Sequence, residues 1–173
     1  AYMHMLSGGT GLRLIFAKPP ATLSRYLADG LCTLLVSMRH CKEGEVRWPN
    51  EEQMRQWALL VESRQPRLQG CFAFVDGLNL RIEDPADDME QNAYYNQWLG
   101  GCFCSNLFVF NPLGEIIHAK LNAPGSWHDT QLSHQLYWIL ANRVPRGFVI
   151  AADCAFMAAG EECFIFFTCV HTR

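Results

Sequence analysis

Three aspartates are the residues whose types and surroundings indicate chemistry. Asp76 lies within the segment CFAFVDGLNLRI (71–82), Asp129 follows a Gly-Ser turn in GSWHDT, and Asp153 ends the apolar run GFVIAAD. An ionised carboxylate inside a run that predicts a buried strand is costly unless it is paired, hydrogen-bonded or bound to a metal. We therefore expect Asp76 to have a partner.

Carboxylates on neighbouring strands would account for that partner. Two such groups repel each other, and hard divalent cations with oxygen ligands, such as Mg²⁺ or Mn²⁺, relieve the repulsion. Two ions roughly 3.5–4 Å apart can activate a water or a 3′-hydroxyl on one side of a phosphodiester and stabilise the leaving oxygen on the other. If Asp76 and Asp153 meet, the predicted chemistry is cleavage or transfer of a nucleic-acid strand.

Each candidate residue also has an explanation without catalysis. Asp76 precedes a glycine, and Asp-Gly is a strong signal for the turn of a β-hairpin. Asp129 can cap the helix expected after it. His128 can orient a carboxylate or contact a phosphate, or it can be structural. The spacing of the residues alone leaves these alternatives open.

The composition indicates one globular domain with an appendage. The chain has 173 residues, half of them apolar, which is enough to bury a sizeable core. It has no run approaching the roughly eighteen apolar residues of a membrane span, so we expect no membrane association. Its eight cysteines follow no zinc-ligand spacing, and we expect them to be reduced core residues.

The net charge of −3 is unevenly divided. Residues 1–70 contain nine Lys/Arg against six Asp/Glu, a balance of +3, and residues 71–173 contain five against eleven, a balance of −6. An acidic surface repels a phosphate backbone. If the second part of the chain handles DNA, we expect cations in the site to offset that charge.

Two helices are expected ahead of Asp76. The segment 19–38 places leucines at helical spacing, with Thr22 as the N-cap. The segment 48–65 has Asn50 as the N-cap, and Gln53 is placed to complete a capping box.

From Gly70 onward the apolar pattern changes to that of strands. A meander of three antiparallel strands is expected over 70–82, 102–111 and 115–123, followed by a helix over 126–144 and a strand over 146–156. Ser126 or Asp129 is expected to cap that helix, and the acidic segment 83–97 is expected to be a surface loop.

The order of three strands, a helix and a fourth strand predicts an α/β fold with a mixed sheet, in which the fourth strand lies beside the first across a helical crossover. This order is similar to the start of the ribonuclease-H-like fold. In that fold one acidic residue lies on the first, central strand and another at the end of the fourth strand, and Asp76 and Asp153 occupy these two positions. We expect such a sheet with flanking helices, incomplete at its C-terminal end and preceded by a helical segment.

Three segments together carry a resemblance to a known family: FVDGLNLRI, YYNQWLGGCFCSNLFVFNPLGEIIHAKLNAPGSWHDTQL and GFVIAADCAF. In this order they resemble the DDE superfamily endonuclease domain of PIF/Harbinger-type transposases and of the nuclease-like proteins derived from them. The resemblance covers about residues 46–156. It divides the chain into a helical lead-in with the remnant of a helix-turn-helix (1–69) and a partial endonuclease domain (70–173).

The resemblance implies a nuclear, divalent-metal-dependent endonuclease or transposase, a hydrolase of DNA phosphodiester bonds. It implies Mg²⁺ or Mn²⁺ as the cofactor, DNA as the partner, and a separate DNA-binding accessory protein as a further partner. Asp76, Asp153 and Asp129 are the implied catalytic and metal-binding residues, and His128 is the implied supporting residue. By strand order we assign the second metal-binding carboxylate to Asp153, with Asp129 as a close contender because GSWHDT matches the family's strongest local motif.

One departure from the family concerns the third catalytic acid, a glutamate on a later helix. That glutamate lies further along the family's chain than the twenty residues that follow Asp153 here (173 − 153). Glu161 and Glu162 lie in a tail that does not resemble the family's continuation. We therefore expect a truncated copy with weak or absent cleavage. The alternatives are a catalytically inactive metal- or DNA-binding remnant, and a structural protein in which the order of the motifs is coincidence.

Overall fold

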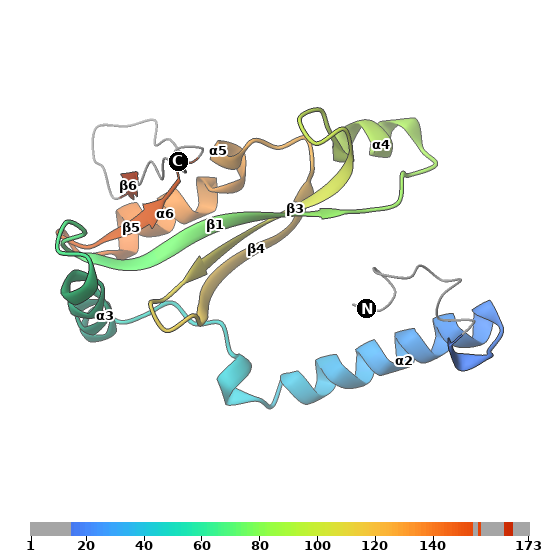
Figure 1. The fold of residues 1–173 in the computed structure, drawn as a ribbon, viewed down its shortest axis with the longest axis horizontal. Helices are drawn as coiled ribbons and strands as arrows, with labels where there is room; N and C mark the ends of the chain where they lie inside the picture. The colour runs from blue at the N-terminus through green and yellow to red at the C-terminus, as the bar shows by residue number, and fades with distance from the viewer. Residues whose placement is uncertain (1–14, 154–155, 157–164, 168–173) are drawn as a thin grey trace. The chain divides into compact units, whose positions relative to one another are not determined.

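The computed structural model describes residues 15–153, 156 and 165–167 (Figure 1). Glu161 and Glu162 lie outside the described residues. The chain forms two compact units, Ala1–Glu45 and Val46–Arg173, and the domain boundary expected between residues 69 and 70 stays a prediction. Within the described ranges, none of the helices combines the length and the apolar character that crossing a membrane requires.

The first unit contains the helix α2 (Pro20–Met38), followed by the short 3₁₀ helix η1 (Lys42–Gly44). The predicted N-cap at Thr22 is wrong, because the helix begins two residues earlier and Pro20 occupies its first turn. A proline is favourable there, since the N–H that it lacks has no partner within a helix. None of the residues of α2 is buried.

The second unit begins with the helix α3 (Glu51–Arg64). Its predicted capping box is confirmed: Asn50 Oδ1 accepts from the Gln53 N–H at 2.9 Å, and Gln53 Oε1 accepts from the Asn50 N–H at 3.0 Å. Met54 and Ala58 of this helix are buried in the main apolar core.

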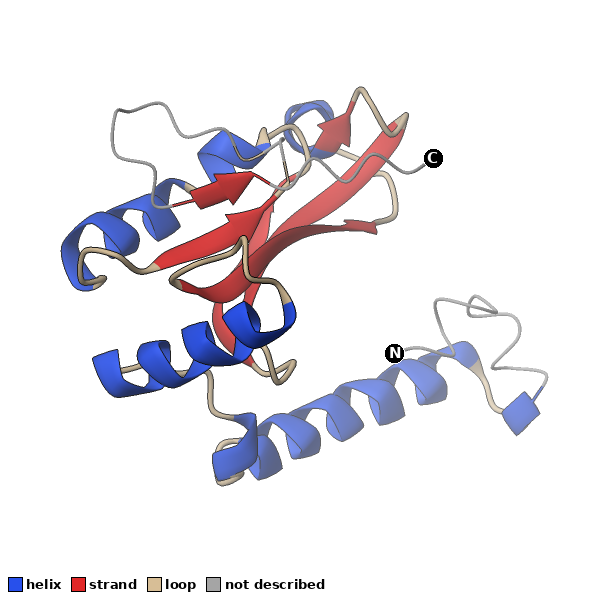
Figure 2. Ribbon diagram, turned by 60° about the vertical axis from the view of Figure 1, so that its left-hand side comes forward, coloured by secondary structure: helices blue, strands red, loops and turns tan. Residues whose placement is uncertain are grey.

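The sheet has β1 (Cys71–Arg81) at its centre (Figure 2). β3 (Gly101–Phe110) pairs with it antiparallel on one side, and β5 (Val149–Ala152) pairs with it parallel on the other. β4 (Ile116–Pro124) extends the sheet antiparallel to β3, and β6 (Ile165–Phe167) lies parallel to β5. The predicted mixed α/β sheet, with the fourth major strand beside the first, is confirmed.

The acidic segment 83–97 is not the loop that we expected. It contains the short helix α4 (Asp88–Tyr94) and the strand β2 (Tyr95–Asn96), which pairs antiparallel with β3. Asp87 caps the helix, because its Oδ1 accepts from the Glu90 N–H at 2.9 Å. A capped helix of this length needs few apolar residues, which is why the composition of the segment did not reveal it.

The helix expected over 126–144 is two helices, α5 (Asp129–Leu132) and α6 (His134–Arg143). They are separated at Ser133, whose hydroxyl donates to the Asp129 carbonyl at 2.6 Å. The N-cap position of α5 is His128, so the predictions of Ser126 or Asp129 as the cap are wrong. Asp129 is therefore not the N-cap residue of α5.

The core forms where the sheet meets its helices. Leu136 and Leu140 of α6 share one buried cluster with Val75, Leu107 and Ile150 of the sheet. The cysteines follow the predicted burial only in part: Cys71 and Cys102 are buried, Cys104 is half-buried, and Cys32 and Cys41 are exposed. Each of these five is a free thiol, and Cys154, Cys163 and Cys169 lie outside the described residues.

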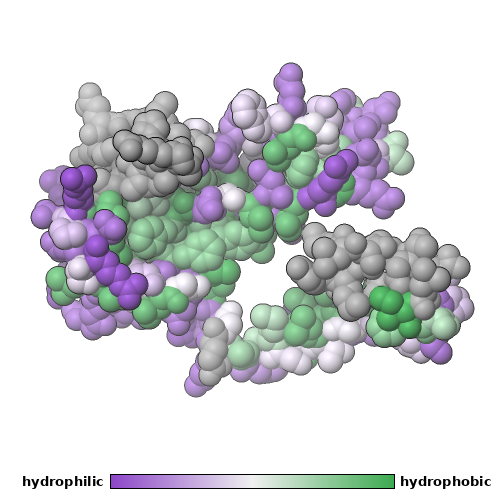
Figure 3. All heavy atoms as spheres, viewed as in Figure 1, coloured by the Kyte–Doolittle hydropathy of each residue, from purple (hydrophilic) through white to green (hydrophobic). Residues whose placement is uncertain are grey.

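β1 changes character in its middle. Its N-terminal part is mostly buried up to Val75, and every residue from Asp76 to Arg81 is exposed. Leu78 and Leu80 are among the exposed apolar residues, and Figure 3 shows apolar side chains over the sheet. The prediction that Asp76 is buried is therefore wrong: its carboxylate stands where the core ends and solvent begins.

Candidate active site

Asp76 lies within a paired strand and not in a turn. It pairs with Phe108 of β3, and the following Gly77 pairs with Leu107, so the alternative of a hairpin turn is wrong. One carboxylate oxygen, Oδ1, accepts a hydrogen bond from the Gly77 N–H at 2.8 Å. Water solvates the exposed carboxylate, which removes the desolvation cost that a buried position would impose.

Asp153 is the residue that follows β5. The register between the two parallel strands pairs Phe74 with Ala151. Two further residues along each strand lead to positions 76 and 153 (74 + 2 and 151 + 2). The register therefore places Asp153, just after β5, level with Asp76, which lies midway along β1. Asp153 is exposed.

Asp129 lies beside the same part of β1. A Cβ atom added at Gly77 would be 3.7 Å from Asp129 Oδ1. Burial raises the pKa of the half-buried Asp129 carboxyl, and so do the negative charges of Asp153 and, less strongly, Asp76, while His128 lowers it. The charges of Asp153 and Asp76 therefore both act on Asp129, and we call these three residues the acidic cluster.

The acidic cluster matches a divalent cation in its chemistry. Its donors are carboxylate oxygens, which Mg²⁺ and Mn²⁺ prefer. Burial and, after it, repulsion by Asp153 and Asp76 raise the Asp129 pKa, and a cation would relieve the repulsion. Among the residues that the structure describes, no group of three or more His, Cys, Asp or Glu side chains is arranged to hold a metal ion. The carboxylate oxygens of the acidic cluster therefore suit a divalent cation chemically, but the described side chains are not already arranged around a metal position.

The Gly-Ser turn positions Asp129 at the start of α5. A Cβ added at Gly125 would lie 2.4 Å from the carbonyl oxygens of both Phe103 and Tyr94, so only glycine fits at this position. The Trp127 N–H donates to the Pro124 carbonyl at 3.0 Å and closes the turn. The glycine of the GSWHDT motif therefore has a packing role that also fixes the catalytic candidate.

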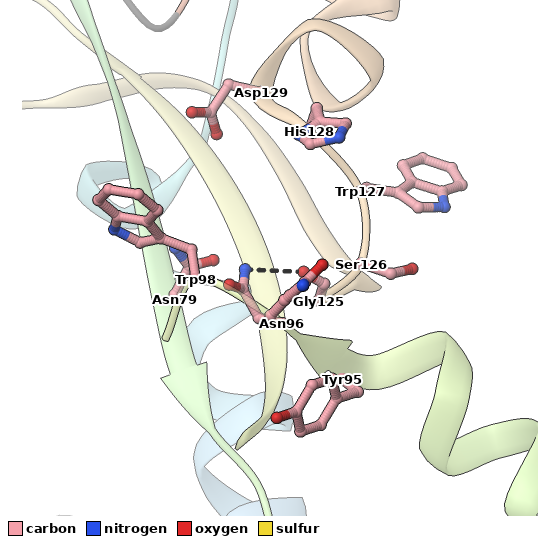
Figure 4. Close-up of a pocket in the computed structure, with 10 residues that line it drawn as sticks. Asn79, Tyr95, Asn96, Trp98, Gly125, Ser126, Trp127, His128 and Asp129 are labelled. Atoms are coloured by element: carbon pink, nitrogen blue, oxygen red, sulfur yellow. Dashed lines mark hydrogen bonds between the residues drawn. The ribbon is translucent and has the colours of Figure 1, made fainter. Parts of the chain in front are cut away.

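A second turn, between β2 and β3, is tied to the first. Asn96 Nδ2 donates to the Gly125 carbonyl at 2.9 Å (Figure 4). Asn96 Oδ1 accepts from the Leu99 N–H at 3.0 Å. Gly100 completes this turn with a positive φ of 69°. The sequence analysis gave these residues no role, although Asn followed closely by Gly-Gly is a turn signal.

A pocket of about 660 Å³ lies where the two turns meet (Figure 4). Its lining comprises the aromatic residues Tyr95, Trp98 and Trp127, the amides Asn79, Asn96 and Gln97, and Gly125, Ser126, His128 and Asp129. Asp129 belongs both to this lining and to the acidic cluster. The pocket therefore opens directly beside the candidate metal-binding carboxylates, and the sequence analysis did not find it.

The family model described as DDE superfamily endonuclease matches residues 75–170. This is 96 of the 173 residues (170 − 75 + 1), and it includes all three aspartates of the acidic cluster. The chain belongs to the DDE superfamily endonuclease family, a class of transposase-like nucleases that act on DNA and generally use divalent metals. No curated protein and no solved structure matches the chain.

Proposed function

We propose that this chain is a PIF/Harbinger-type DDE endonuclease domain that cleaves or transfers DNA strands with Mg²⁺ or Mn²⁺. The observation that carries the proposal is the acidic cluster. Asp129 lies beside Gly77 of β1, and the register places Asp153 level with Asp76. Burial, and after it the negative charges of Asp153 and Asp76, raise the pKa of Asp129. Membership of the DDE superfamily endonuclease family supports the same chemistry.

Each residue of the site has a definite part in the proposal. Divalent ions, when bound, would offset the charge of the carboxylates and polarise the phosphodiester. Asp76, Asp129 and Asp153 would hold them. The hydrogen bond from the Gly77 N–H orients Asp76, and the electrostatic effect of His128 lowers the pKa of Asp129, which favours its ionised, metal-binding form.

The test is nicking of supercoiled plasmid DNA in Mn²⁺, compared with EDTA. Because the family's third catalytic acid has no counterpart here, we expect only weak nicking by the wild type, above the EDTA control, and its loss in Asp76→Asn, Asp129→Asn and Asp153→Asn. The matched control is Asp29→Asn, which makes the same change of charge on the exposed helix α2. Nicking that persists in all three cluster variants would contradict the proposal.

The same variants separate the active nuclease from a catalytically inactive metal- or DNA-binding remnant. Calorimetric titration with Mn²⁺ should give binding that each cluster substitution weakens. Binding of this kind without any nicking by the wild type would support the inactive remnant. No binding to the folded wild type would remove the metal site altogether.

Two further parts of the proposal concern the cell. The net charge of −6 over residues 71–173 disfavours DNA binding without help, which supports a separate DNA-binding partner. The resemblance to PIF/Harbinger-type transposases is what supports a nuclear location. A tagged chain that stays outside the nucleus, with or without candidate DNA-binding partners, would argue against this part.

A further inference from the structure

Trp98 projects from the turn between β2 and β3 and is 95% exposed. An indole in water leaves a large apolar surface without the burial that usually stabilises it. The turn that carries Trp98 is nevertheless well fixed, because both ends of the Asn96 amide are hydrogen-bonded. A fixed turn that presents a bare aromatic ring at the mouth of a pocket is suited to stacking against a planar ligand.

The amide groups of the pocket supply directional contacts. Asn79 Oδ1 accepts from the Ser105 hydroxyl at 2.7 Å, which orients this amide, and Asn79 is part of the pocket lining. Gln97 adds a second amide beside Trp98. Donors and acceptors around an aromatic platform are the groups that recognise the edge and the face of a nucleobase.

The charge of the lining decides between a base and a phosphate. The residues that line the pocket, all within the described part of the chain, include neither lysine nor arginine. The acidic Asp129 is among them, and its carboxylate would repel a phosphate. A neutral, planar group is therefore the ligand that this lining accepts.

We propose that the pocket binds one unpaired nucleobase of a DNA strand, stacked on Trp98, next to the phosphodiester that the acidic cluster would cleave. This inference rests on the proposed function. The volume of about 660 Å³ falls within the roughly 300–1,000 Å³ of small-molecule sites. In Figure 4 the Trp127 ring points away from the other labelled side chains, which makes Trp98 the stacking residue.

A base in a duplex must leave its stack before it can enter such a pocket, and this step costs free energy. Single-stranded DNA should therefore bind better than duplex DNA of the same sequence. The base pocket and the acidic cluster would then act on adjacent parts of one strand, the first holding a base and the second holding the backbone.

The test uses a fluorescently labelled single-stranded oligonucleotide with an uncharged methylphosphonate backbone. This probe removes the repulsion between phosphates and the acidic protein, and it does not depend on a metal. Anisotropy should show that the wild type binds it more tightly than the same strand built with abasic sites. Trp98→Ala should weaken binding of the strand with bases by roughly 5- to 150-fold and leave the abasic strand unaffected.

Trp98→Phe should restore much of the binding, since a phenyl ring also stacks. The matched control is Trp138→Ala, which removes another exposed indole, on α6, and should leave binding unchanged. Equal binding of the abasic strand, or no effect of Trp98→Ala in a chain whose circular dichroism matches the wild type, would overturn the base pocket. Mn²⁺-dependent nicking is scored separately, so failure of the nuclease and failure of the base pocket give different results.

Discussion

Replacing Asp129 by asparagine should make the metal-free protein more stable at neutral pH. Burial and the charge of Asp153 raise the pKa of the Asp129 carboxyl above its ordinary value of 3.8. The folded state therefore binds this proton more tightly than the unfolded chain does, and the free energy of unfolding falls as the pH rises from 3.8 through the raised value. Asparagine keeps the shape of the side chain and removes the charge.

The size of the effect follows from the exposure of the three carboxylates. A shift of one pKa unit is worth about 1.4 kcal/mol. Asp129 is half-buried, but Asp76 and Asp153 are exposed, so water screens their repulsion. We expect Asp129→Asn to raise the free energy of unfolding at pH 7 by less than about 1 kcal/mol. The gain should vanish below pH 3.8, where the carboxyl is protonated in both states.

Divalent ions should reduce the stability advantage of Asp129→Asn over the wild type. At ten times its dissociation constant, an ion adds about 1.4 kcal/mol to the stability of the state that binds it. The wild type should gain this amount, and Asp129→Asn should gain less because it has lost a ligand.

The assay is urea unfolding followed by tryptophan fluorescence, in EDTA and in Mn²⁺, between pH 3.5 and 8. Asp29→Asn on α2 controls for the change in net charge. The reasoning would be refuted if Asp129→Asn were less stable than the wild type in EDTA at pH 7, or if the difference were the same at both ends of the pH range.

Three further changes test the surrounding structure. Gly125→Ala places a methyl group 2.4 Å from the Phe103 and Tyr94 carbonyl oxygens, and we expect a loss on the order of 1–3 kcal/mol in urea unfolding together with loss of nicking. Asn50→Ala removes the capping box of α3 and should cost about 1 kcal/mol, seen as a lower urea midpoint with unchanged nicking. Burial lowers the pKa of His118 from 6.5. The free energy of unfolding should therefore decrease as the pH falls below 6.5 toward the lowered pKa. In urea midpoints measured over this pH range, His118→Phe should show a smaller decrease than the wild type.

The parts of the fold that could be predicted from the sequence are those determined by nearby residues or by the order of strands and helices along the chain. The Asn50 capping box depends on residues three positions apart. The pairing of β1 with β5 was expected from the order of strands and helix, which is similar to the start of the ribonuclease-H-like fold. The helix α4 escaped prediction because capping by Asp87, and not an apolar stripe, marks its beginning.

The exposure of Asp76 could not be predicted because apolar residues continue beyond the core. Leu78 and Leu80 extend the apolar alternation of β1, yet they are 45% and 38% exposed. A pattern of residue types shows which side chains are apolar enough to be buried, but it does not show which of them other parts of the chain pack against. The carboxylate that seemed to require a buried partner in fact faces solvent.

The candidate site also has parts that could be predicted from the sequence and parts that could not. The place of Asp153 after the strand that neighbours β1 was predicted from strand order. The place of Asp129 beside Gly77 depends on how the start of α5 folds back on the sheet, which no spacing reveals. The pocket depends on the hydrogen bond between Asn96 and Gly125, which lie 29 residues apart, and tertiary contacts of this kind leave no local signal.

The hydrogen bond from Asn96 to Gly125 has a consequence for where a strand would be cut. It joins the turn that carries Trp98 to the turn that leads into Asp129, so the two cannot shift independently while it persists. With one nucleobase held at the first turn and the backbone held at the second, the tie acts as a molecular ruler. On the proposed function, cleavage should fall at a constant number of nucleotides from the captured base, whatever the sequence between them.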